Sequence, residues 1–195
     1  MRPSSWIEID LSAVEANVLT LRRACAGARL CAVLKADGYA MGSVELARTL
    51  ERAGADMMAV YTTADARPLL AAGVAAPILV LGPMWLEDLA GDPIVADAAR
   101  RGRLHLTAHS VEQTASLETW ARDRDATLPV HVEVDTGMSR GGASPDDAEA
   151  IVRLVAASDR LRLAGAMSHF ASADRDADAT PDRAPRFTRG LSPAR

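Results

Sequence analysis

Short apolar runs bounded by turn residues recur along this chain at a nearly even spacing, and that spacing limits the folds it can adopt. The centres of consecutive runs lie 22 to 34 residues apart, which leaves room for one helix and two loops between neighbouring runs. Buried strands that alternate with helices are typical of a parallel sheet, either open and doubly wound or closed into an eight-unit barrel. We predict strands at residues 31–34, 57–61, 78–81, 104–106, 130–134 and 163–167.

The evenness of the spacing favours the barrel over the open sheet. No glycine-rich dinucleotide-binding turn follows the first strand, which argues against the Rossmann arrangement. We therefore predict an α/β chain of the (β/α)8 TIM-barrel type that is incomplete, with about six of the eight strands present. Residues 6–10 (WIEID) form a further strand candidate ahead of the first helix, which such a barrel does not require.

Helix starts are predicted where a side-chain oxygen can accept hydrogen bonds from the unpaired N–H groups of a first turn. One region departs from ordinary helix chemistry. Pro68 falls inside the helix expected over residues 62–72, so that helix is expected to be kinked or to begin later. The predicted starts are Ser12 with Glu15, Ser110 with Gln113, and Ser144 followed by Pro145.

The charge balance and the cysteine content exclude several kinds of partner and environment. The chain has 22 Lys and Arg against 26 Asp and Glu, so it carries no net positive charge to attract a nucleic acid. No apolar stretch approaches the roughly 18 residues of a membrane span, and residues 1–10 do not read as a secretion signal. Cys25 and Cys31 are too few for a disulfide framework, and we expect both to be buried thiols. These features predict a cytoplasmic protein that binds neither nucleic acid nor membrane.

Lys35 follows the first predicted strand directly, in the segment KADGYAMG of residues 35–42. Active sites of parallel barrels lie at the carboxyl ends of the strands, so a lysine there is a candidate for chemistry. Its amine can form a Schiff base with a carbonyl group, and partial burial makes the amine more nucleophilic. Tyr39 lies between Gly38 and Gly42, where its hydroxyl can donate to a phosphate. A solvated lysine and a packing tyrosine are the plain alternatives.

The fifth predicted strand alternates valines with polar residues. Val130, Val132 and Val134 share one face, which we expect to pack on the outer helices. The polar side chains of the other face would then line the barrel interior, where each needs a partner or a ligand. These polar residues are His131, Glu133 and Asp135.

Two further polar residues follow strand ends. Arg140 lies on the glycine-rich loop after the fifth strand, where its guanidinium can bind an anion or a phenolate oxygen. The alternative is a structural ion pair with Glu133 or Asp135. His169 ends the sixth strand. Lys35, Arg140 and His169 thus fall at the same end of three strands, which favours a shared site.

These segments strongly resemble the alanine racemase family, whose members are pyridoxal 5'-phosphate (PLP) enzymes with an N-terminal (β/α)8 barrel and a C-terminal β domain. Several motifs in the family's order carry the resemblance along most of the chain. They are WIEIDLSAVEAN at residues 6–17, AVLKADGYAMG at 32–42, ILVLG at 78–82, VEVDTGMSRGG at 132–142 and SHFASAD at 168–174.

The resemblance implies a role for each candidate residue. Lys35 would be the lysine that forms the aldimine with PLP and the base for one face of the substrate α-carbon. Tyr39 would donate a hydrogen bond to the cofactor phosphate. Arg140 would contact the phenolic oxygen of the cofactor and the carboxylate of an amino-acid substrate. His169 would lie beside the cofactor ring and belong to its hydrogen-bond network.

Two positions depart from the family pattern. Met41 stands where the family has a histidine, although the neighbouring tyrosine is kept. Glu133 stands where some members carry a carbamylated lysine that holds the active-site arginine. Because a carboxylate offers the same negative charge as a carbamate, we predict that Glu133 orients Arg140.

The resemblance also implies that residues 1–195 are the N-terminal portion of a PLP-binding barrel. Eight units of about 25 residues need about 200 residues from Arg29 onward, so we expect the last two strands and the C-terminal β domain to be absent. Family members are homodimers in which that domain supplies a tyrosine, the base for the opposite face, across the dimer. The chain is therefore expected to be inactive by itself. Residues 171–195, which are poor in large apolar residues, are expected to form a mobile tail.

Two other functions stay open at this point. One is a single-domain PLP-binding homeostasis protein, whose barrel also carries a first-strand lysine. The other is a degenerate fragment that binds nothing. The DTGMSRGG segment at residues 135–142 and the SHFA segment at 168–171 fit the racemase better than the homeostasis protein.

Overall fold

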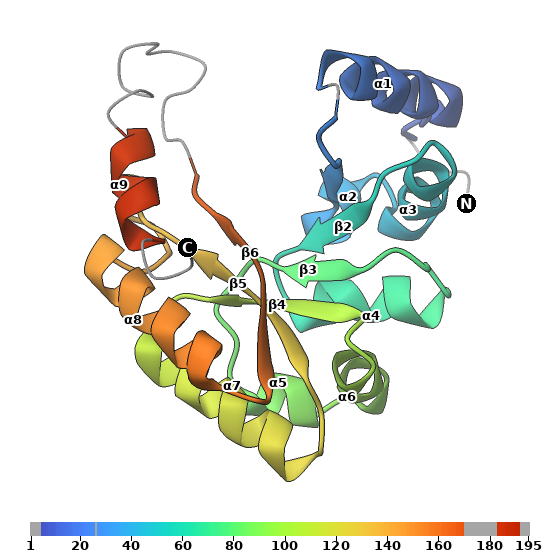
Figure 1. Cartoon of the computed structure of the whole chain (residues 1–195). Coiled ribbons are helices and arrows are strands. Elements are labelled where there is room, and N and C mark those ends of the chain that lie inside the picture. The colour runs from blue at the N-terminus through green and yellow to red at the C-terminus, as the bar shows by residue number, and fades with distance from the viewer. Residues whose placement is uncertain (1–4, 26, 170–182, 192–195) are drawn as a thin grey trace.

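The computed structural model describes residues 5–25, 27–169 and 183–191 (Figure 1). Six parallel strands form one sheet in sequence order, so each inner strand pairs with its two neighbours along the chain. Within the described residues, the first and last strands are paired on one side only and the sheet is not closed. The α/β class and the six strands of an incomplete barrel are thereby confirmed. The strands are β1 (Cys31–Val33), β2 (Met57–Val60), β3 (Ile78–Val80), β4 (Leu104–Ala108), β5 (Leu128–Glu133) and β6 (Leu161–Met167).

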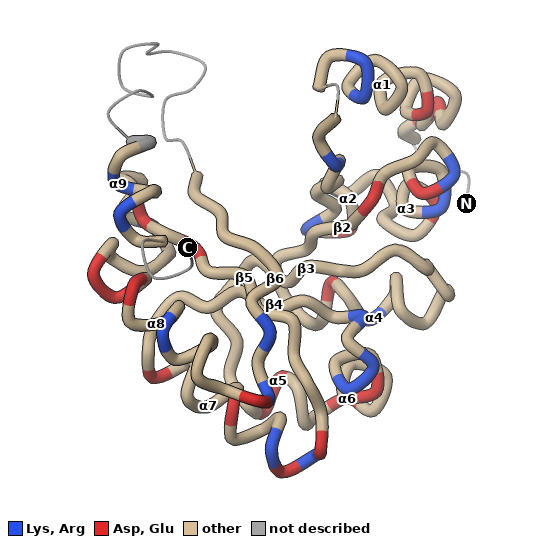
Figure 2. Tube along the Cα trace, viewed as in Figure 1, with Lys and Arg blue, Asp and Glu red and all other residues tan. Residues whose placement is uncertain are grey.

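Helices connect the successive strands, as the spacing of the apolar runs predicts, and those over residues 63–71, 93–100, 111–123 and 145–157 pack against the sheet (Figure 1). Charged residues gather on these helices and on the loops around the sheet (Figure 2). No helix in the described part of the chain is long and apolar enough to cross a bilayer. The helices are α1 (Leu11–Ala24), α2 (Lys35–Ala40), α3 (Ser43–Arg52), α4 (Thr63–Ala71), α5 (Leu86–Ala90), α6 (Pro93–Arg100), α7 (Val111–Asp123), α8 (Pro145–Ala157) and α9 (Arg183–Gly190).

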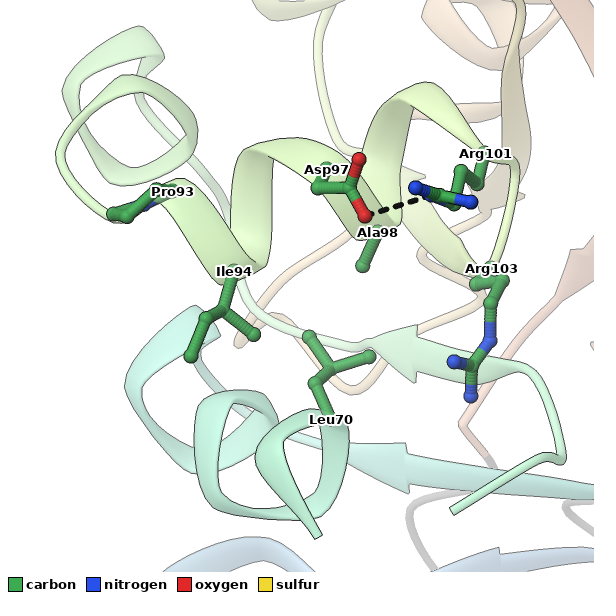
Figure 3. Close-up of a pocket in the computed structure, with 7 residues that line it drawn as sticks. All are labelled: Leu70, Pro93, Ile94, Asp97, Ala98, Arg101 and Arg103. Atoms are coloured by element: carbon green, nitrogen blue, oxygen red, sulfur yellow. Dashed lines mark hydrogen bonds and ion pairs between the residues drawn. The ribbon is translucent and has the colours of Figure 1, made fainter. Parts of the chain in front are cut away.

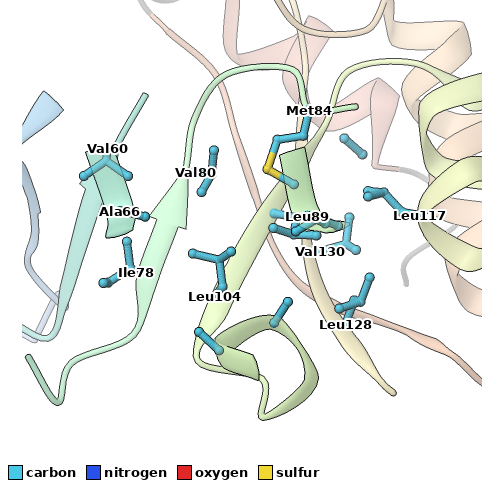
Figure 4. Packing of buried hydrophobic residues seen from close by; sticks show 14 of the residues in the cluster. Val60, Ala66, Ile78, Val80, Met84, Leu89, Leu104, Leu117, Leu128 and Val130 are labelled. Carbon is cyan, nitrogen blue, oxygen red and sulfur yellow. The ribbon is translucent and has the colours of Figure 1, made fainter. Parts of the chain in front are cut away.

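The main core lies between the sheet and its helices, and Figure 4 shows part of it. Val130, Val132 and Val134 are fully buried there, whereas His131 and Glu133 on the opposite face are only partly buried. The predicted two faces of the fifth strand are therefore confirmed. Burying the valines fixes the strand's orientation, because a shift by one residue would turn them away from the helices.

Two of the three predicted helix starts are confirmed. The hydroxyl of Ser110 accepts from Gln113 N at 3.1 Å, and that of Ser144 accepts from Asp147 N at 3.1 Å. The start at Ser12 was wrong, because Asp10 is the capping residue of α1 and accepts from Ser12 N at 2.9 Å. Hydrogen bonds from the Ser12 hydroxyl and from the first-turn N–H groups hold the pKa of Asp10 below its usual range.

Pro68 neither interrupts α4 nor delays its start. The helix runs unbroken over Thr63–Ala71 and is capped by Thr62, whose hydroxyl accepts from Asp65 N while the Asp65 carboxylate accepts from Thr62 N. The proline removes one helical hydrogen bond. Burial of the next residues, Leu69 and Leu70, offsets that loss, because both join the main core.

The strand expected at residues 6–10 was wrong. This segment has no regular structure, and Trp6 and Ile7 are exposed. A strand forms only where a neighbouring strand accepts its hydrogen bonds, and none in the described part of the chain does so here. The expected burial of the two cysteines was also wrong, since Cys25 closes α1 at the surface and Cys31 lies on the edge strand β1, exposed in both cases.

Residues 171–195 were expected to form a mobile tail, but residues 183–190 of this segment form the helix α9. Residues 171–182 and 192–195 lie outside the described residues. Helix α9 packs on α8, where its Gly190 lies against the Ala148 side chain and its Arg189 pairs with Asp146 at 2.6 Å. Phe187 and Leu191 pack against the main core. These two residues, the large apolar ones that the composition of the tail contains, explain why a helix docks there.

Candidate functional site

The candidate residues gather at the carboxyl ends of the strands, as the parallel arrangement predicts. Lys35 follows β1 after the buried Leu34, whose N–H donates to Ala59 O at 2.7 Å and keeps the chain on the sheet to that point. The loop with Arg140 follows β5, and His169 follows β6. One edge of the sheet therefore carries all three.

A left-handed turn follows Lys35, and the sequence analysis did not predict it. The backbone φ angles lie between +52° and +64° over the five residues from Ala36 to Ala40. Such a conformation costs roughly 1 kcal/mol or more for each residue other than glycine, so other contacts must hold it. Strain of this kind is frequent next to functional side chains.

Local hydrogen bonds hold the left-handed turn. Asp37 Oδ1 accepts from both the N–H and the hydroxyl of Ser43 at 2.8 Å, which also caps the start of α3. These bonds from Ser43 hold the pKa of Asp37 below its usual range. Gly38 N donates to Leu34 O at 2.9 Å, and Gly42 N donates to Asp37 O at 3.0 Å. These hydrogen bonds close the turn locally, between Leu34 and Ser43.

The turn brings Lys35 and Tyr39 together. The Lys35 amine lies 5.9 Å from the centre of the Tyr39 ring. Lys35 is half-buried and Tyr39 is exposed. Within the described residues, Lys35 has no carboxylate within ion-pair distance, so its amine is not held by a salt bridge.

The loop after β5 folds back onto its own strand. Ala143 N donates to Glu133 O and Asp135 N donates to Ala143 O, both at 2.8 Å. The Asp135 side chain accepts from Gly137 N at 2.8 Å and from Ser139 N at 3.1 Å. These bonds close the loop of residues 137–142, which presents Arg140 at the surface.

Glu133 does not make the direct contact with Arg140 that the sequence suggested. Its Oε2 lies 3.2 Å from Nδ1 of His109, a residue just beyond β4. The contacts of the described residues include none between Glu133 and Arg140. The orienting role expected for Glu133 stays a prediction without a direct contact behind it, since Glu133 reaches a residue just beyond β4 while Arg140 lies on the exposed loop.

His109 joins three segments, and the sequence reading missed it. Its Nε2 lies 3.0 Å from Leu81 O, its Nδ1 accepts from Gly142 N at 3.0 Å, and its own N–H donates to the Gln113 side chain at 2.8 Å. The signal that could have found it is its place soon after the strand predicted at residues 104–106; in the structure it directly follows β4, as Lys35 follows the strand predicted at 31–34.

His169 is linked to the Arg140 loop through its neighbour in the chain, Ser168. The hydroxyls of Thr136 and Ser168 are 2.8 Å apart and tie the start of that loop to the end of β6. His169 itself is exposed, and its neighbour Phe170 lies outside the described residues. Among the described contacts, none joins Lys35 to Arg140 or His169.

A pair of histidines, His105 and His131, lies on the inner face of the sheet, nearer the amino ends of the strands. His105 Nδ1 and His131 Nε2 are 2.9 Å apart. Burial, then the charge of His131, Arg162 and Arg29, lowers the pKa of His105 to about 4. Burial, Arg162 and Arg29 also lower the pKa of His131. Both rings are therefore neutral at pH 7, and this pair is the partner that the predicted interior polar residue His131 required.

A pocket of about 280 Å³ opens between α4 and α6, away from these residues (Figure 3). Its charged side chains are already paired, since Arg101 bonds to Asp97 at 2.7 Å and Arg103 donates to Val74 O. Arg103 immediately precedes β4, so the pocket lies toward the amino ends of the strands. Barrel chemistry takes place at the opposite ends, and we do not assign the site to this pocket.

Known proteins match this chain in both sequence and structure. The family model described as "Alanine racemase, N-terminal domain" matches residues 9–195. An alanine racemase of Synechocystis sp. is 36% identical over 197 residues, which cover 100% of this chain and 51% of that protein. An alanine racemase structure from Clostridium difficile 630 superimposes with a TM-score of 0.86 at 28% identity, over 98% of this chain and 49% of that chain.

A histidine racemase structure from Leuconostoc mesenteroides is also similar, with a TM-score of 0.79 and 29% identity over 92% of this chain and 47% of that chain. The chain thus spans about half the length of the relatives it matches. The motifs of the strand ends and the arrangement of the sheet agree with the match of the family model over almost the whole chain. This chain belongs to the alanine racemase family.

Proposed function

We propose that this chain binds PLP through Lys35 and forms part of an amino-acid racemase that interconverts L-alanine and D-alanine. The observation that carries the proposal is the half-buried Lys35, which stands at the carboxyl end of β1 without a salt bridge in the described residues. A lysine in such a place has an amine available for a carbonyl group. Relatives named alanine racemase support the choice of reaction and of substrate.

The residues of the site fit the donor and acceptor groups of PLP. The phosphate needs donors, and the exposed Tyr39, whose ring centre lies 5.9 Å from the Lys35 amine, offers its hydroxyl. The phenolic oxygen is an anion, and Arg140 has no ion-pair partner among the described residues to compete for its guanidinium. When bound, PLP acts as the electron sink that stabilises the charge left on the substrate α-carbon.

Each side chain has a distinct part in the proposed reaction. Lys35 holds the cofactor and exchanges the α-proton on one face of the substrate. Tyr39 donates to the phosphate and fixes its position. Arg140 donates to the phenolic oxygen and to the substrate carboxylate, and His169 lies beside the ring. The strained turn after β1 keeps the Lys35 amine and the Tyr39 hydroxyl in one fixed relation.

Racemisation also needs a proton donor on the opposite face. The resemblance assigns that role to a tyrosine of a C-terminal domain, contributed across a homodimer. These 195 residues span about half the length of the matched relatives, so we expect them to bind the cofactor but not to turn over alanine unless such a domain is present. Binding of the cofactor is therefore the step that this chain can be tested for directly.

The test is a titration of the chain with PLP followed by absorbance. We expect a new visible band that the Lys35→Ala variant does not form, with Arg48→Ala as a matched control, because Arg48 is an exposed cation on α3. Absence of the band in the unaltered chain would contradict the proposal and favour the inert fragment.

A second assay separates a racemase from a PLP-binding homeostasis protein. L-alanine, L-serine, L-lysine and L-histidine are added to the PLP-loaded chain, and the visible band is followed at each concentration. Histidine is included because a solved histidine racemase has a similar structure. A racemase site changes its spectrum with its own amino acid, and we expect alanine to act at the lowest concentration. A spectrum that no amino acid changes would favour the homeostasis protein.

A further inference from the structure

We infer that His109 is a positioning residue that holds the loop of residues 137–142, and with it Arg140, through the Gly142 N–H. The inference rests on the proposed function, in which Arg140 contacts the cofactor and the substrate. Its physical basis lies entirely in contacts among described residues. His109 itself touches neither Lys35 nor Arg140 in those contacts.

The ring of His109 is fixed from both sides. Leu81 O, a carbonyl oxygen, can only accept, so the Nε2 that lies 3.0 Å from it carries a proton. The Gly142 N–H can only donate, so the Nδ1 that lies 3.0 Å from it presents its lone pair. These two contacts together define one neutral form of the ring. Because its side chain is only 12% exposed, the ring has little freedom to turn.

The loop end that His109 holds is itself rigid. Gly142 has a φ of +91°, and a Cβ atom there would lie 3.0 Å from Asp135 N and 3.1 Å from Glu133 Cγ. Only glycine fits this corner, and its N–H direction is set by the turn. Asp135 secures the other end of the loop through Gly137 N. Arg140 therefore sits between two anchored ends, one local and one supplied by His109.

Glu133 competes with the loop for the same nitrogen. Its Oε2 lies 3.2 Å from His109 Nδ1, and an ionised carboxylate pairs with that nitrogen only when the nitrogen carries a proton. A protonated Nδ1 can no longer accept from Gly142 N. The loop is therefore held by the form of His109 whose Nδ1 carries no proton and accepts from Gly142 N.

The other groups that face His109 are neutral. They are the Leu81 carbonyl from the loop after β3, the Gln113 amide from α7 and the Gly142 N–H from the loop after β5. Among the described contacts of the ring, Glu133 is thus the one charged group.

The test uses two substitutions that separate the two roles of the ring. His109→Asn keeps an acceptor close to the place of Nδ1 but does not titrate. His109→Leu keeps the volume but removes both ring contacts. The matched control is His105→Asn, on β4 just ahead of His109, whose ring contacts His131 and not the loop. Folding of each variant is checked by circular dichroism and thermal unfolding.

Two readouts follow the loop and the cofactor separately. The first is the Gly142 amide signal and its hydrogen-exchange rate in the PLP-free chain between pH 5 and pH 8. The second is the PLP dissociation constant over the same range. For His109→Leu we expect Gly142 exchange to rise by about tenfold or more and PLP affinity to fall by about five- to tenfold, the effect of losing one hydrogen bond.

The His109→Asn variant gives the sharpest comparison. Because its side-chain oxygen can accept from Gly142 N, its Gly142 exchange should stay within about twofold of that of the unaltered chain, unlike that of His109→Leu. The PLP affinity of His109→Asn should stay within about twofold of the unaltered chain at pH 8, since one acceptor replaces another. His105→Asn should change neither readout at pH 8.

Each outcome decides between the two proposals. A folded His109→Leu variant with unchanged Gly142 exchange overturns the inference. Loosened exchange with unchanged PLP affinity also overturns it, because the loop then does not position Arg140, while the proposed function stands. Failure of the unaltered chain to bind PLP overturns the proposed function and this inference together. If His109→Leu does not fold, the Gly142 exchange of His109→Asn still decides: exchange that stays protected supports the inference, and exchange loosened by about tenfold overturns it.

Discussion

The turn after β1 and the loop after β5 lie at the same edge of the sheet, yet different kinds of contact hold them. The first turn is closed by bonds among neighbours, above all from Ser43 to Asp37, six residues apart. The second loop has local bonds to Asp135 as well, but it also donates a bond to His109, which is 33 residues away from Gly142. The geometry of Lys35 is thus encoded almost beside it, whereas that of Arg140 depends on how β4 and β5 pair.

The largest effect that would test this contrast is expected from the long-range anchor. His109→Leu leaves Leu81 O and Gly142 N without their partner at a site that is nearly buried. We expect the free energy of unfolding to fall by about 2 to 3 kcal/mol, the cost of buried polar groups left unpaired. Urea unfolding measures it. A loss below that of an exposed substitution such as Thr119→Ala would show that the loop does not need His109.

The histidine pair nearer the amino ends of the strands gives the next effect. Because the folded state lowers the pKa of His105 to about 4, the unfolded chain binds a proton that the folded chain does not. Its contribution to stability is complete above pH 6.5 and is lost as the pH falls toward about 4. Allowing for the solvent that reaches the ring, we expect a loss of roughly 1 to 2 kcal/mol.

Urea unfolding at pH 7.5, 6 and 5 checks this prediction before most carboxylates titrate. His105→Gln keeps polar contacts without a titrating ring, so its stability should depend less on pH over this range. Equal slopes for the variant and the unaltered chain would show that the pair does not respond to acid.

A smaller effect is expected from the local turn. Ser43→Ala removes the hydroxyl that donates to Asp37 but keeps the backbone bond to the same oxygen. Since one of two bonds survives, we expect unfolding to become easier by only about 1 kcal/mol. Ser116→Ala, whose hydroxyl bonds to its own exposed helix, is the matched control. A loss equal to that of His109→Leu would remove the contrast between the two regions.

The smallest effect concerns the strain of the turn. Ala40 has a φ of +64°, which glycine adopts more easily than alanine. We expect Ala40→Gly to stabilise the chain by about 0.5 kcal/mol, because relief of strain outweighs the greater freedom of the unfolded glycine. The same change at Ala16, in the middle of α1, should cost about 1 kcal/mol. Destabilisation at both positions would mean that the left-handed turn carries little strain.

Much of the fold could be predicted from local patterns. The six strands, their parallel order and the buried face of Val130, Val132 and Val134 follow from the spacing and alternation of apolar residues, because burial acts on each segment in the same way. The place of Lys35 follows from the same pattern, since it stands where a strand stops. The strand expected at residues 6–10 failed because a strand also needs a neighbour, which apolar alternation does not supply.

The contacts between strands could not be predicted in the same way. Glu133 was expected to orient Arg140, seven residues along the chain, but its carboxylate contacts His109, just beyond the adjacent strand β4. The register of β4 and β5 sets which of these side chains meet. The left-handed backbone after Lys35 is likewise a result of bonds that form only when α3 begins at Ser43. Residue order therefore specifies the layers and the strand ends that carry the chemistry. The geometry at those ends arises only when the strands pair, because hydrogen bonds depend on distances and directions that apolar spacing does not encode.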